Sequence, residues 1–276
     1  METSSDFLLR IFSIAQIELR AGEWRAESVF DPFWRFYVNE RDGFEVFCDG
    51  ETSKTVALRE NTAYIIPAQT LFSGRNTAAS RHFYIHFDVV GALPFAACGE
   101  TAPVIEVALS DAMRCALLEP LSDATPMTAI EAHGSRATFL PIMRARALLH
   151  AIFAASLEQG VMRSRETNPA LTAIQPALDF MERHIHQRLS NRVLAQQCRF
   201  STDHFIEVFR CATGTTPAQF LMERRLSVAA QQLLFSNDKL ETIAQATGFC
   251  DRFHLSRAFK KRFGQTPVAY RNTRLV

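Results

Sequence analysis

Residues 243–274 read IAQATGFCDRFHLSRAFKKRFGQTPVAYRNTR, and this stretch decides the fold of the C-terminal part of the chain. A similar stretch, LAQQCRFSTDHFIEVFRCATGTTPAQFLMERR, begins at Leu194. The two match at an offset of 49 up to Phe200 and Phe249, and at an offset of 50 from Phe205 and Leu255 onward. So many matches at a nearly constant spacing indicate a duplicated supersecondary unit.

Each copy has the pattern of a helix-turn-helix unit. A small residue in the first helix, Ala195 or Ala244, allows the second helix to approach closely. The expected ends of the helices follow from capping preferences: N-caps at Ser201 and Asp251, left-handed C-caps at Gly214 and Gly264, and first-turn prolines at Pro217 and Pro267.

Charge is unevenly distributed along the chain. Leu171–Val276 holds 15 Lys and Arg against 8 Asp and Glu, and the preceding 170 residues hold 15 against 21. The C-terminal part therefore has a net charge of +7 and the N-terminal part −6. A basic part joined to an acidic one indicates that the former meets a polyanion, with chance unevenness as the alternative.

Composition favours a globular protein of two domains, because the chain has 276 residues of which 47% are hydrophobic and 21% charged. It contains no uninterrupted run of eighteen apolar residues, and METSSDFLLRIFSIAQIELR at the N-terminus lacks a basic start and a cleavage site. We therefore expect neither a membrane span nor a signal peptide. The six cysteines form no C-x-x-C pair, so the sequence indicates neither a zinc ribbon nor a redox motif. Scattered reduced thiols fit a cytosolic protein.

The stretch from about Phe30 to Val90 is typical of strands. Its short aromatic and β-branched runs are FWRFYV, FEVFCDG, TVALRE, AYIIPA and HFYIHFDVV, separated by turn residues that include 74–77. Leu109–Leu118 and Phe139–Leu157 have helical spacing. The polar segment 160–169, GVMRSRETNP, indicates a linker with a domain boundary near residue 165.

These patterns predict an α+β protein. Residues 1–165 are expected to form a small antiparallel β-barrel with helices, with a sandwich as the alternative, and residues 171–276 an all-α domain of two helix-turn-helix units. A helical bundle is the alternative for the second domain, and the tandem copies disfavour it.

The segment from about Ala173 to Arg274 resembles the DNA-binding domain of the AraC/XylS family, over a bit more than a third of the chain. The second copy carries the family signature nearly throughout: the I-A at 243, the G-F at 248, Asp251, the R-x-F-K at 257, the F-G at 263 and the P-x-x-Y-R at 267. The resemblance implies seven helices, with one long helix at about Pro217–Phe235 holding two DNA-reading units.

In such a domain the exposed N-terminal residues of the second helix of each unit contact base edges. In the second unit these are Arg252, Phe253, His254 and Arg257. Either arginine can donate to guanine O6 and N7, His254 can donate to an acceptor, and Phe253 can pack on a thymine methyl. The opposite face, expected in the core, carries Leu255, Phe259 and Phe263.

The corresponding residues of the first unit are Thr202, Asp203, Ile206 and Glu207. The family often has arginine where Glu207 stands. Because a carboxylate accepts from cytosine N4 but repels phosphate, the first unit either reads cytosine-containing steps or docks weakly, and we favour weak docking.

Arg199 replaces the glycine usual in the turn, which stands at Gly248 in the second unit. A left-handed conformation would strain this arginine by about 1 kcal/mol.

Five further basic residues are expected to contact phosphates, with a solvated surface charge as the alternative for each: Arg210, Lys260, Lys261, Arg262 and Arg271. The two units should enter successive faces of the major groove, about 34 Å apart.

The strand-rich part resembles the cupin-type sensor domain that precedes this DNA-binding domain in many family members. The resemblance lies in AYIIPAQTLF (63–72) and HFYIHFDVV (82–90). If the polar side of the second segment lines the barrel, His82, Tyr84 and His86 could hold a small effector, as in members that sense sugars. Trp34, Arg35 and Tyr37 could contribute from an earlier strand. Satisfied core histidines or a solvated face of the strand are the alternatives.

We expect no metal, no other cofactor and no enzymatic activity. His82 and His86 lie about 13 Å apart along a strand, too far to share one ion. The sequence also lacks G-x-x-x-x-G-K-[ST], the phosphate-binding loop of ATPases. A cupin-type enzyme with an appended basic helical module is the alternative.

The resemblance implies a cytoplasmic transcription regulator, in this family mostly an activator. The implied partners are double-stranded DNA, a small-molecule effector such as a sugar, RNA polymerase and a second copy of the chain, with no membrane. Phe139–Leu157 either pairs two chains or packs on its own sheet.

Overall fold

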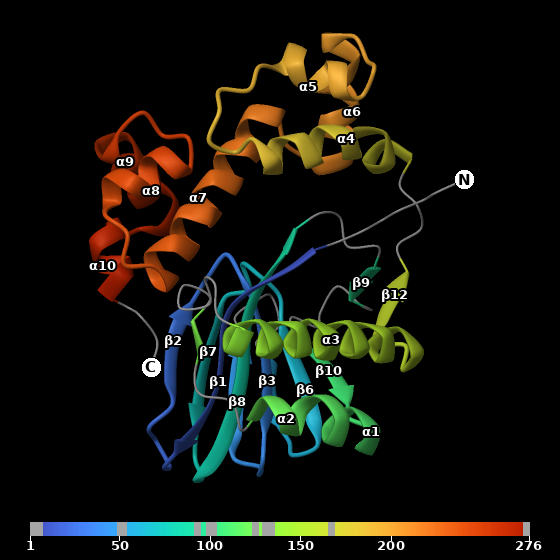
Figure 1. Ribbon diagram of the computed structural model, residues 1–276, viewed down its shortest axis with the longest axis vertical. Coiled ribbons are helices and arrows are strands. Elements are labelled where there is room, and N and C mark those ends of the chain that lie inside the picture. The colour runs from blue at the N-terminus through green and yellow to red at the C-terminus, as the bar shows by residue number, and fades with distance from the viewer. Residues whose placement is uncertain are drawn as a thin grey trace. The chain divides into compact units, whose positions relative to one another are not determined.

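The computed structural model describes residues 8–48, 54–90, 95–97, 104–122, 127–128, 136–164 and 169–272. It divides into two compact units, Leu9–Val89 with Phe95–Ser164, and Arg165–Val276 with Met1–Leu8 and Val90–Pro94. The first unit contains the sheets, and residues 169–272 are helical (Figure 1). The prediction of sheets in the N-terminal region followed by a helical C-terminal region is confirmed.

The strands of the N-terminal unit form two larger sheets and one short pair. The six-stranded sheet has the order β10 (Ile105–Ala108), β6 (Thr62–Ile66), β3 (Trp34–Asn39), β8 (Ser80–Val90), β1 (Leu8–Leu19) and β11 (Met127–Thr128). The four-stranded sheet has the order β2 (Arg25–Val29), β7 (Phe72–Asn76), β4 (Phe44–Cys48) and β5 (Lys54–Leu58). The short pair joins β9 (Phe95–Ala97) and β12 (Met162–Ser164).

The two larger sheets share one hydrophobic core. Tyr37 and Ile66 of the six-stranded sheet pack with Phe44, Val46 and Phe72 of the four-stranded sheet, and all five are buried. A closed barrel requires each edge strand to pair with the next, but among the described strands no ladder joins the two sheets. The expected closed barrel was therefore wrong, and the described strands form an open sandwich.

Helices cover the other face of the six-stranded sheet (Figure 1). The helical segments are α1 (Asp111–Met113), the π-helical η1 (Arg114–Leu118), α2 (Glu119–Ser122) and α3 (Arg136–Glu158). The ring of Phe153 on α3 contacts Trp34 and Phe87 at centroid distances of 6.3 Å each. The predicted helix at Phe139–Leu157 is confirmed, whereas the one at Leu109–Leu118 is broken into a short helix and a π-helical turn.

The α3 segment Phe139–Glu158 is long and apolar enough to cross a membrane by length and composition, with a mean hydropathy of 1.3. This corrects the expectation that no segment qualifies, which counted only uninterrupted apolar runs. The segment is weak evidence for a membrane, because core helices pass the same test. Leu148, Leu149, Ile152 and Phe153 are buried within the unit, as in such a core helix.

Two predicted loop segments contain strand residues. Gly74 lies inside β7 instead of a turn. A Cβ atom there would lie 2.5 Å from the ring of Trp24, so glycine permits that close approach. The predicted linker at 160–169 begins with a turn and β12, and its residues 165–168 lie outside the described ones.

The C-terminal unit has the seven helices that the resemblance implies, counted over residues 169–272. They are α4 (Pro169–Arg183), α5 (Asn191–Gln197), α6 (Thr202–Thr213), α7 (Pro217–Phe235), α8 (Leu240–Ala246), α9 (Arg252–Phe263) and α10 (Pro267–Asn272). The long helix α7 spans the residues expected of it.

Candidate nucleic-acid interface

Two helix-turn-helix units are present, formed by α5 with α6 and by α8 with α9. Ala195 and Ala244 are buried, and so are Phe205, Phe209, Leu255 and Phe259 on the inner faces of α6 and α9. These contacts leave the opposite face of each second helix to solvent. Phe263 is half-buried against Phe259 and Tyr270, at centroid distances of 4.4 and 5.5 Å.

The expected capping residues are confirmed. The Ser201 side chain accepts a hydrogen bond from the backbone N–H of His204, and the Asp251 side chain accepts one from His254. Gly214 and Gly264 end α6 and α9 in the left-handed conformation, with φ of 73° and 74°. These caps fix the first turns of α6 and α9, where the candidate base-reading residues stand.

The turn between the two helices also repeats. Arg199 has a φ of 56° and Gly248 a φ of 75°, so both copies use the left-handed region at this position. The condition for backbone strain at Arg199 is therefore met, because a Cβ atom is disfavoured there.

In the second unit, Arg252, Phe253 and Arg257 are exposed at the front of α9, and 62% of Phe253 is accessible. The Arg252 guanidinium lies 4.8 Å from the centre of the Phe253 ring. His254 is half-buried, with its ring against Phe249 at 5.2 Å. Three of the four proposed base-reading side chains are thus presented openly, and the fourth is partly held by the turn.

The first unit presents a different surface at the equivalent positions. Asp203 and Glu207 are exposed, Thr202 is half-buried, and Ile206 packs partly into the core of its own unit. Over the whole of α6, Arg210 is the single lysine or arginine, whereas α9 has five and no carboxylate. The two second helices therefore differ strongly in charge.

The five candidate phosphate residues fall into two groups. Arg210, Lys260 and Lys261 are exposed. Arg262 is ion-paired with Glu223 of α7 at 2.5 Å, and Arg271 donates to the backbone oxygen of Asp238 at 2.6 Å. These two arginines are engaged inside the unit, so the first three are better placed for phosphate.

One element of the repeat was missed in the sequence. His204 packs edge-on against Phe200 at 4.8 Å, in the same way as His254 packs against Phe249. The matched offsets of 49 for the phenylalanines and 50 for the histidines were the available signal. Each ring pair ties the start of a second helix to its turn.

Five of the six candidate effector residues share the inner face of the six-stranded sheet. Register pairs Arg35 with His86, Tyr37 with Tyr84, and Asn39 with His82. Trp34 does not belong to this group, because strand alternation turns it to the face covered by α3.

Aromatic rings pack around the two inner-face histidines. His82 contacts Tyr37 at 4.8 Å and stacks on Phe44 at 5.2 Å, and its Nδ1 lies 2.7 Å from Asn39 Oδ1. Burial lowers the pKa of His82 to about 3. Burial, together with Arg35 and His82, holds the pKa of His86 well below its usual range. Both histidines are thus neutral core residues in this conformation.

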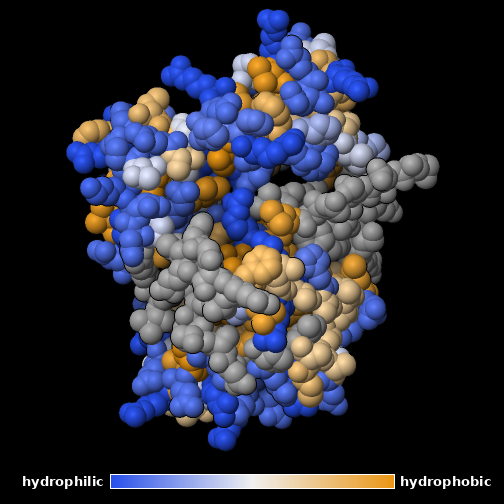
Figure 2. Space-filling view, viewed as in Figure 1, coloured by the Kyte–Doolittle hydropathy of each residue, from blue (hydrophilic) through white to orange (hydrophobic). Residues whose placement is uncertain are grey.

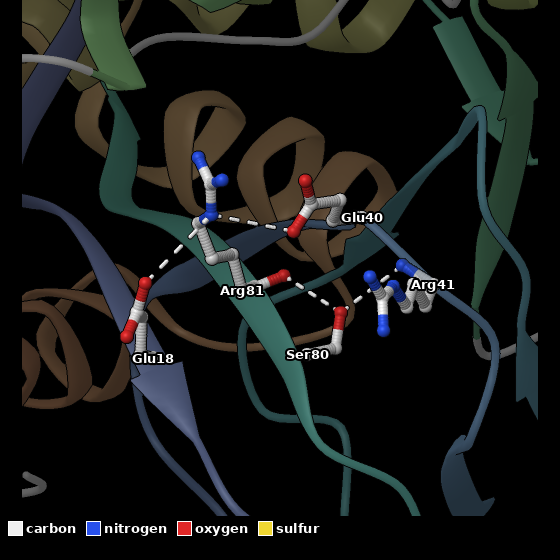
Figure 3. A network of polar contacts seen from close by, with 5 residues as sticks. All are labelled: Glu18, Glu40, Arg41, Ser80 and Arg81. Atoms are coloured by element: carbon white, nitrogen blue, oxygen red, sulfur yellow. Dashed lines mark hydrogen bonds and ion pairs between the residues drawn. The ribbon is translucent and has the colours of Figure 1, made fainter.

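A cavity of about 460 Å³ lies elsewhere in the N-terminal unit. Its apolar lining includes Val38, Phe83 and Leu118, and its polar lining includes the side chains that follow: Gln16, Asn61, Glu40, Arg81, Arg114 and Glu119. Arg81 lies 3.3 Å from Glu40 and 3.9 Å from Glu18, and neighbouring Ser80 accepts from the Arg41 backbone N–H (Figure 3). Arginine donors and carboxylate acceptors therefore stand side by side at this cavity.

Sequence comparison places the C-terminal unit among known regulators. A family model described as a helix-turn-helix domain matches residues 194–273. The MmsAB operon regulatory protein of Pseudomonas aeruginosa is 36% identical over 92 residues, which is 33% of this chain and 30% of that protein. The chain thus spans about a third of the length of several relatives, including that one.

One further relative and one solved structure extend the comparison. The multiple antibiotic resistance protein MarA of Escherichia coli is 30% identical over 112 residues, covering 41% of this chain and 87% of MarA. The crystal structure of ToxT from Vibrio cholerae matches the whole of both chains with a TM-score of 0.55 and 11% identity, a likeness of fold. With the tandem units and their signature, the match to MarA shows that the chain belongs to the AraC/XylS family of transcription regulators.

Proposed function

We propose that the chain is a sequence-specific DNA-binding transcription regulator that activates transcription with RNA polymerase in the cytoplasm. The tandem of two helix-turn-helix units in one basic unit carries this proposal. Among the relatives that match the C-terminal unit, the MmsAB operon protein of Pseudomonas aeruginosa is named as a regulatory protein, which supports the same function.

The second unit supplies most of the sequence-specific contacts. Arg252 and Arg257 donate to guanine edges in the major groove, and Phe253 packs on a thymine methyl. Lys260 and Lys261 neutralise phosphates at the end of the same helix. The first unit docks more weakly, because Asp203 and Glu207 face the same polyanion without an arginine beside them on the front of α6.

The salt dependence of DNA binding tests this binding mode, in which lysines of α9 neutralise phosphates. We expect the full chain to bind a pool of random duplexes with an affinity that falls steeply with salt. Replacing Lys260 and Lys261 by alanine should lower the slope of log K against log salt by about 2. Arg41→Ala, an exposed charge of the N-terminal unit, serves as the control. Binding without salt dependence would contradict the mode.

The effector is proposed to be a neutral, sugar-sized polyol that binds in the 460 Å³ cavity. That volume lies in the range of small-molecule sites, about 300–1,000 Å³. A hydroxyl both donates and accepts, which suits a lining where arginines and amides alternate with carboxylates. The inner-face histidines mark the alternative position for the effector, but packed aromatic rings fill the space around them. With an effector bound in this cavity, the N-terminal unit acts as an open, cupin-like sensor domain.

Thermal unfolding with a panel of aldopentoses and aldohexoses tests the effector proposal. Both tryptophans, Trp24 and Trp34, lie in the N-terminal unit, so their fluorescence reports its unfolding alone. A ligand at 100 times its Kd should stabilise by about 2.7 kcal/mol. Arg81→Gln should abolish that effect and His86→Gln should retain it. The opposite result would move the site to the inner face of the sheet.

A second copy of the chain is proposed to pair through the first half of α3. Phe139, Leu140 and Met143 are 62%, 52% and 44% exposed there. Figure 2 shows apolar side chains gathered over this helix. Grouped exposed apolar side chains commonly mark an interface.

Light scattering of the full chain tests the pairing. Leu140→Glu should turn a dimer into a monomer. Leu157→Glu, at the other end of the same helix, is the matched control and should leave the mass unchanged. A wild-type monomer at micromolar concentration would contradict this pairing.

A further inference from the structure

Three consecutive residues near the middle of α7 each bind a different part of the C-terminal unit. Glu223 pairs with Arg262 of α9 at 2.5 Å. Arg224 forms a two-pronged ion pair with Glu182 of α4, at 2.8 and 2.9 Å. Arg225 reaches the loop between α4 and α5. The long helix is thus fastened at its centre to α9 of the second helix-turn-helix unit and to α4 with its following loop, which shares a core with the first unit.

Arg225 makes two charge-assisted hydrogen bonds to that loop. Its Nε donates to the backbone oxygen of Ile185 at 2.8 Å, and its Nη2 donates to that of Gln187 at 2.5 Å. The guanidinium is half-buried, and burial lowers its pKa. A rigid guanidinium fork bonded to two carbonyls holds a fixed geometry, because its planar donors have few alternatives.

The turn of the second helix-turn-helix unit packs on this same junction. A Cβ atom at Gly248 would lie 2.7 Å from the Ile185 oxygen and 2.8 Å from Cζ of Arg225. Gly248 therefore meets two demands, a left-handed backbone and a close approach. Since Arg199 stands at the equivalent position of the first unit, only the left-handed backbone is required there.

We infer that Arg225 is a positioning residue that fixes the separation between the two DNA elements the chain accepts. It joins the α4–α5 loop, which packs with the first helix-turn-helix unit, to the turn that precedes α9 in the second. One inserted base pair moves a DNA element by about 3.4 Å and rotates it by about 36°. With the hydrogen bonds of Arg225 in place, the two helix-turn-helix units cannot move apart or rotate to match the displaced DNA element. Without those hydrogen bonds they can. This inference rests on the proposed function.

The test compares the affinity of the chain for DNA duplexes that differ in the spacing between the two elements. A two-element duplex is selected from a random pool with the full chain, and derivatives are made with one base pair inserted or removed between the elements. We expect wild type to bind the derivatives about tenfold more weakly, and Arg225→Met to reduce this ratio to about twofold. Arg224→Met breaks a neighbouring ion pair that does not touch the second turn, so it should keep the wild-type ratio.

The ratio separates positioning from a general structural role. If Arg225→Met lowered binding to all spacings by one factor, or changed none, the inference would be overturned. Arg225→Lys keeps the charge but not the fork, and an intermediate ratio in that variant supports the inference even if the methionine variant unfolds. A wild type that binds specifically without any spacing preference overturns the inference alone. A wild type that selects no sequence overturns the proposed function with it.

Discussion

Arg199 and Gly248 occupy the same turn position in the two units, and the difference between them is informative. Both have a left-handed backbone, which a side chain disfavours. Only Gly248 is also pressed against a neighbouring carbonyl and guanidinium. The first unit therefore tolerates an arginine at a cost, whereas the second cannot accommodate one.

Arg199→Gly should raise the stability of the C-terminal unit by up to about 1 kcal/mol, because relief of strain exceeds the added chain entropy. Gly248→Ala should lower it, since the new methyl group has no room. Urea unfolding followed by circular dichroism at the helical band measures both changes. Equal effects of the two substitutions would show that the turns have the same environment.

Arg257 and Lys260 stand one turn apart on α9 and are assigned different roles. Arg257→Ala should cost about 1–3 kcal/mol and relax specificity at one base pair. Lys260→Ala should weaken binding to all sequences alike, because phosphate carries no sequence information. Competition binding with a set of single-base operator variants separates the two results. Uniform losses from both would remove the base-reading role of Arg257.

At the scale of elements, α6 and α9 share one architecture but not one surface. Glu207 occupies the position that Arg257 has in α9. Glu207→Arg should therefore strengthen overall DNA binding, by about 1–3 kcal/mol, and change the base selected at its element. Sequencing of duplexes bound by wild type and variant measures this. An unchanged motif with unchanged affinity would place α6 away from the groove.

The inner face of the six-stranded sheet makes the N-terminal unit sensitive to acid. His82 and His86 have pKa values below the unfolded value of about 6.5, so the unfolded chain binds more protons below that pH. The stability that neutral His82 and His86 allow is present above pH 6.5 and is lost as the pH falls below that value. For His82, whose pKa in the folded chain is about 3, the loss from pH 7 to pH 5 should be about 2 kcal/mol, and His86 adds a loss of the same sign.

Tryptophan fluorescence during urea unfolding at pH 7 and pH 5 measures this loss. His82→Gln should be less stable at pH 7 but should lose less stability between the two pH values. An identical pH dependence in the variant would mean that His82 is not buried neutral in solution.

The elements that the sequence predicted well are those with local signals. The caps at Ser201 and Asp251, the left-handed glycines and the bounds of α7 follow from residue preferences within a few positions. Strand pairing is non-local, so the short apolar runs predict a barrel or a sandwich without deciding between them, and the pairing of the strands decides for the open sandwich. Likewise, β7 was missed because Gly74 signals a turn until the Trp24 ring beside it is known.

The features of the candidate DNA-binding site also divide into those that local sequence predicts and those that depend on the tertiary fold. Exposure of Arg252, Phe253 and Arg257 follows from helical spacing. The engagement of Arg262 and Arg271 inside the unit depends on Glu223 and Asp238, which lie more than thirty residues away. A sequence pattern identifies the face of a helix, and the partners of a long side chain depend on the tertiary fold.

At the scale of the whole molecule, an N-terminal unit of sheets precedes a C-terminal unit with two helix-turn-helix units. We propose that effector binding to the N-terminal unit changes how the C-terminal unit presents α6 and α9. This coupling requires the effector to bind the two states with different affinities. Effector occupancy that leaves DNA affinity and reporter transcription unchanged would contradict it.

The central claim is that the two helix-turn-helix units read DNA together. The most direct test is selection of bound sequences from random duplexes by the full chain at two salt concentrations. We expect a motif of two elements about one helical turn apart and a steep dependence on salt, and Arg257→Ala should relax specificity at one base pair of the stronger element. Binding without any enriched motif, or without salt dependence, would contradict the central claim.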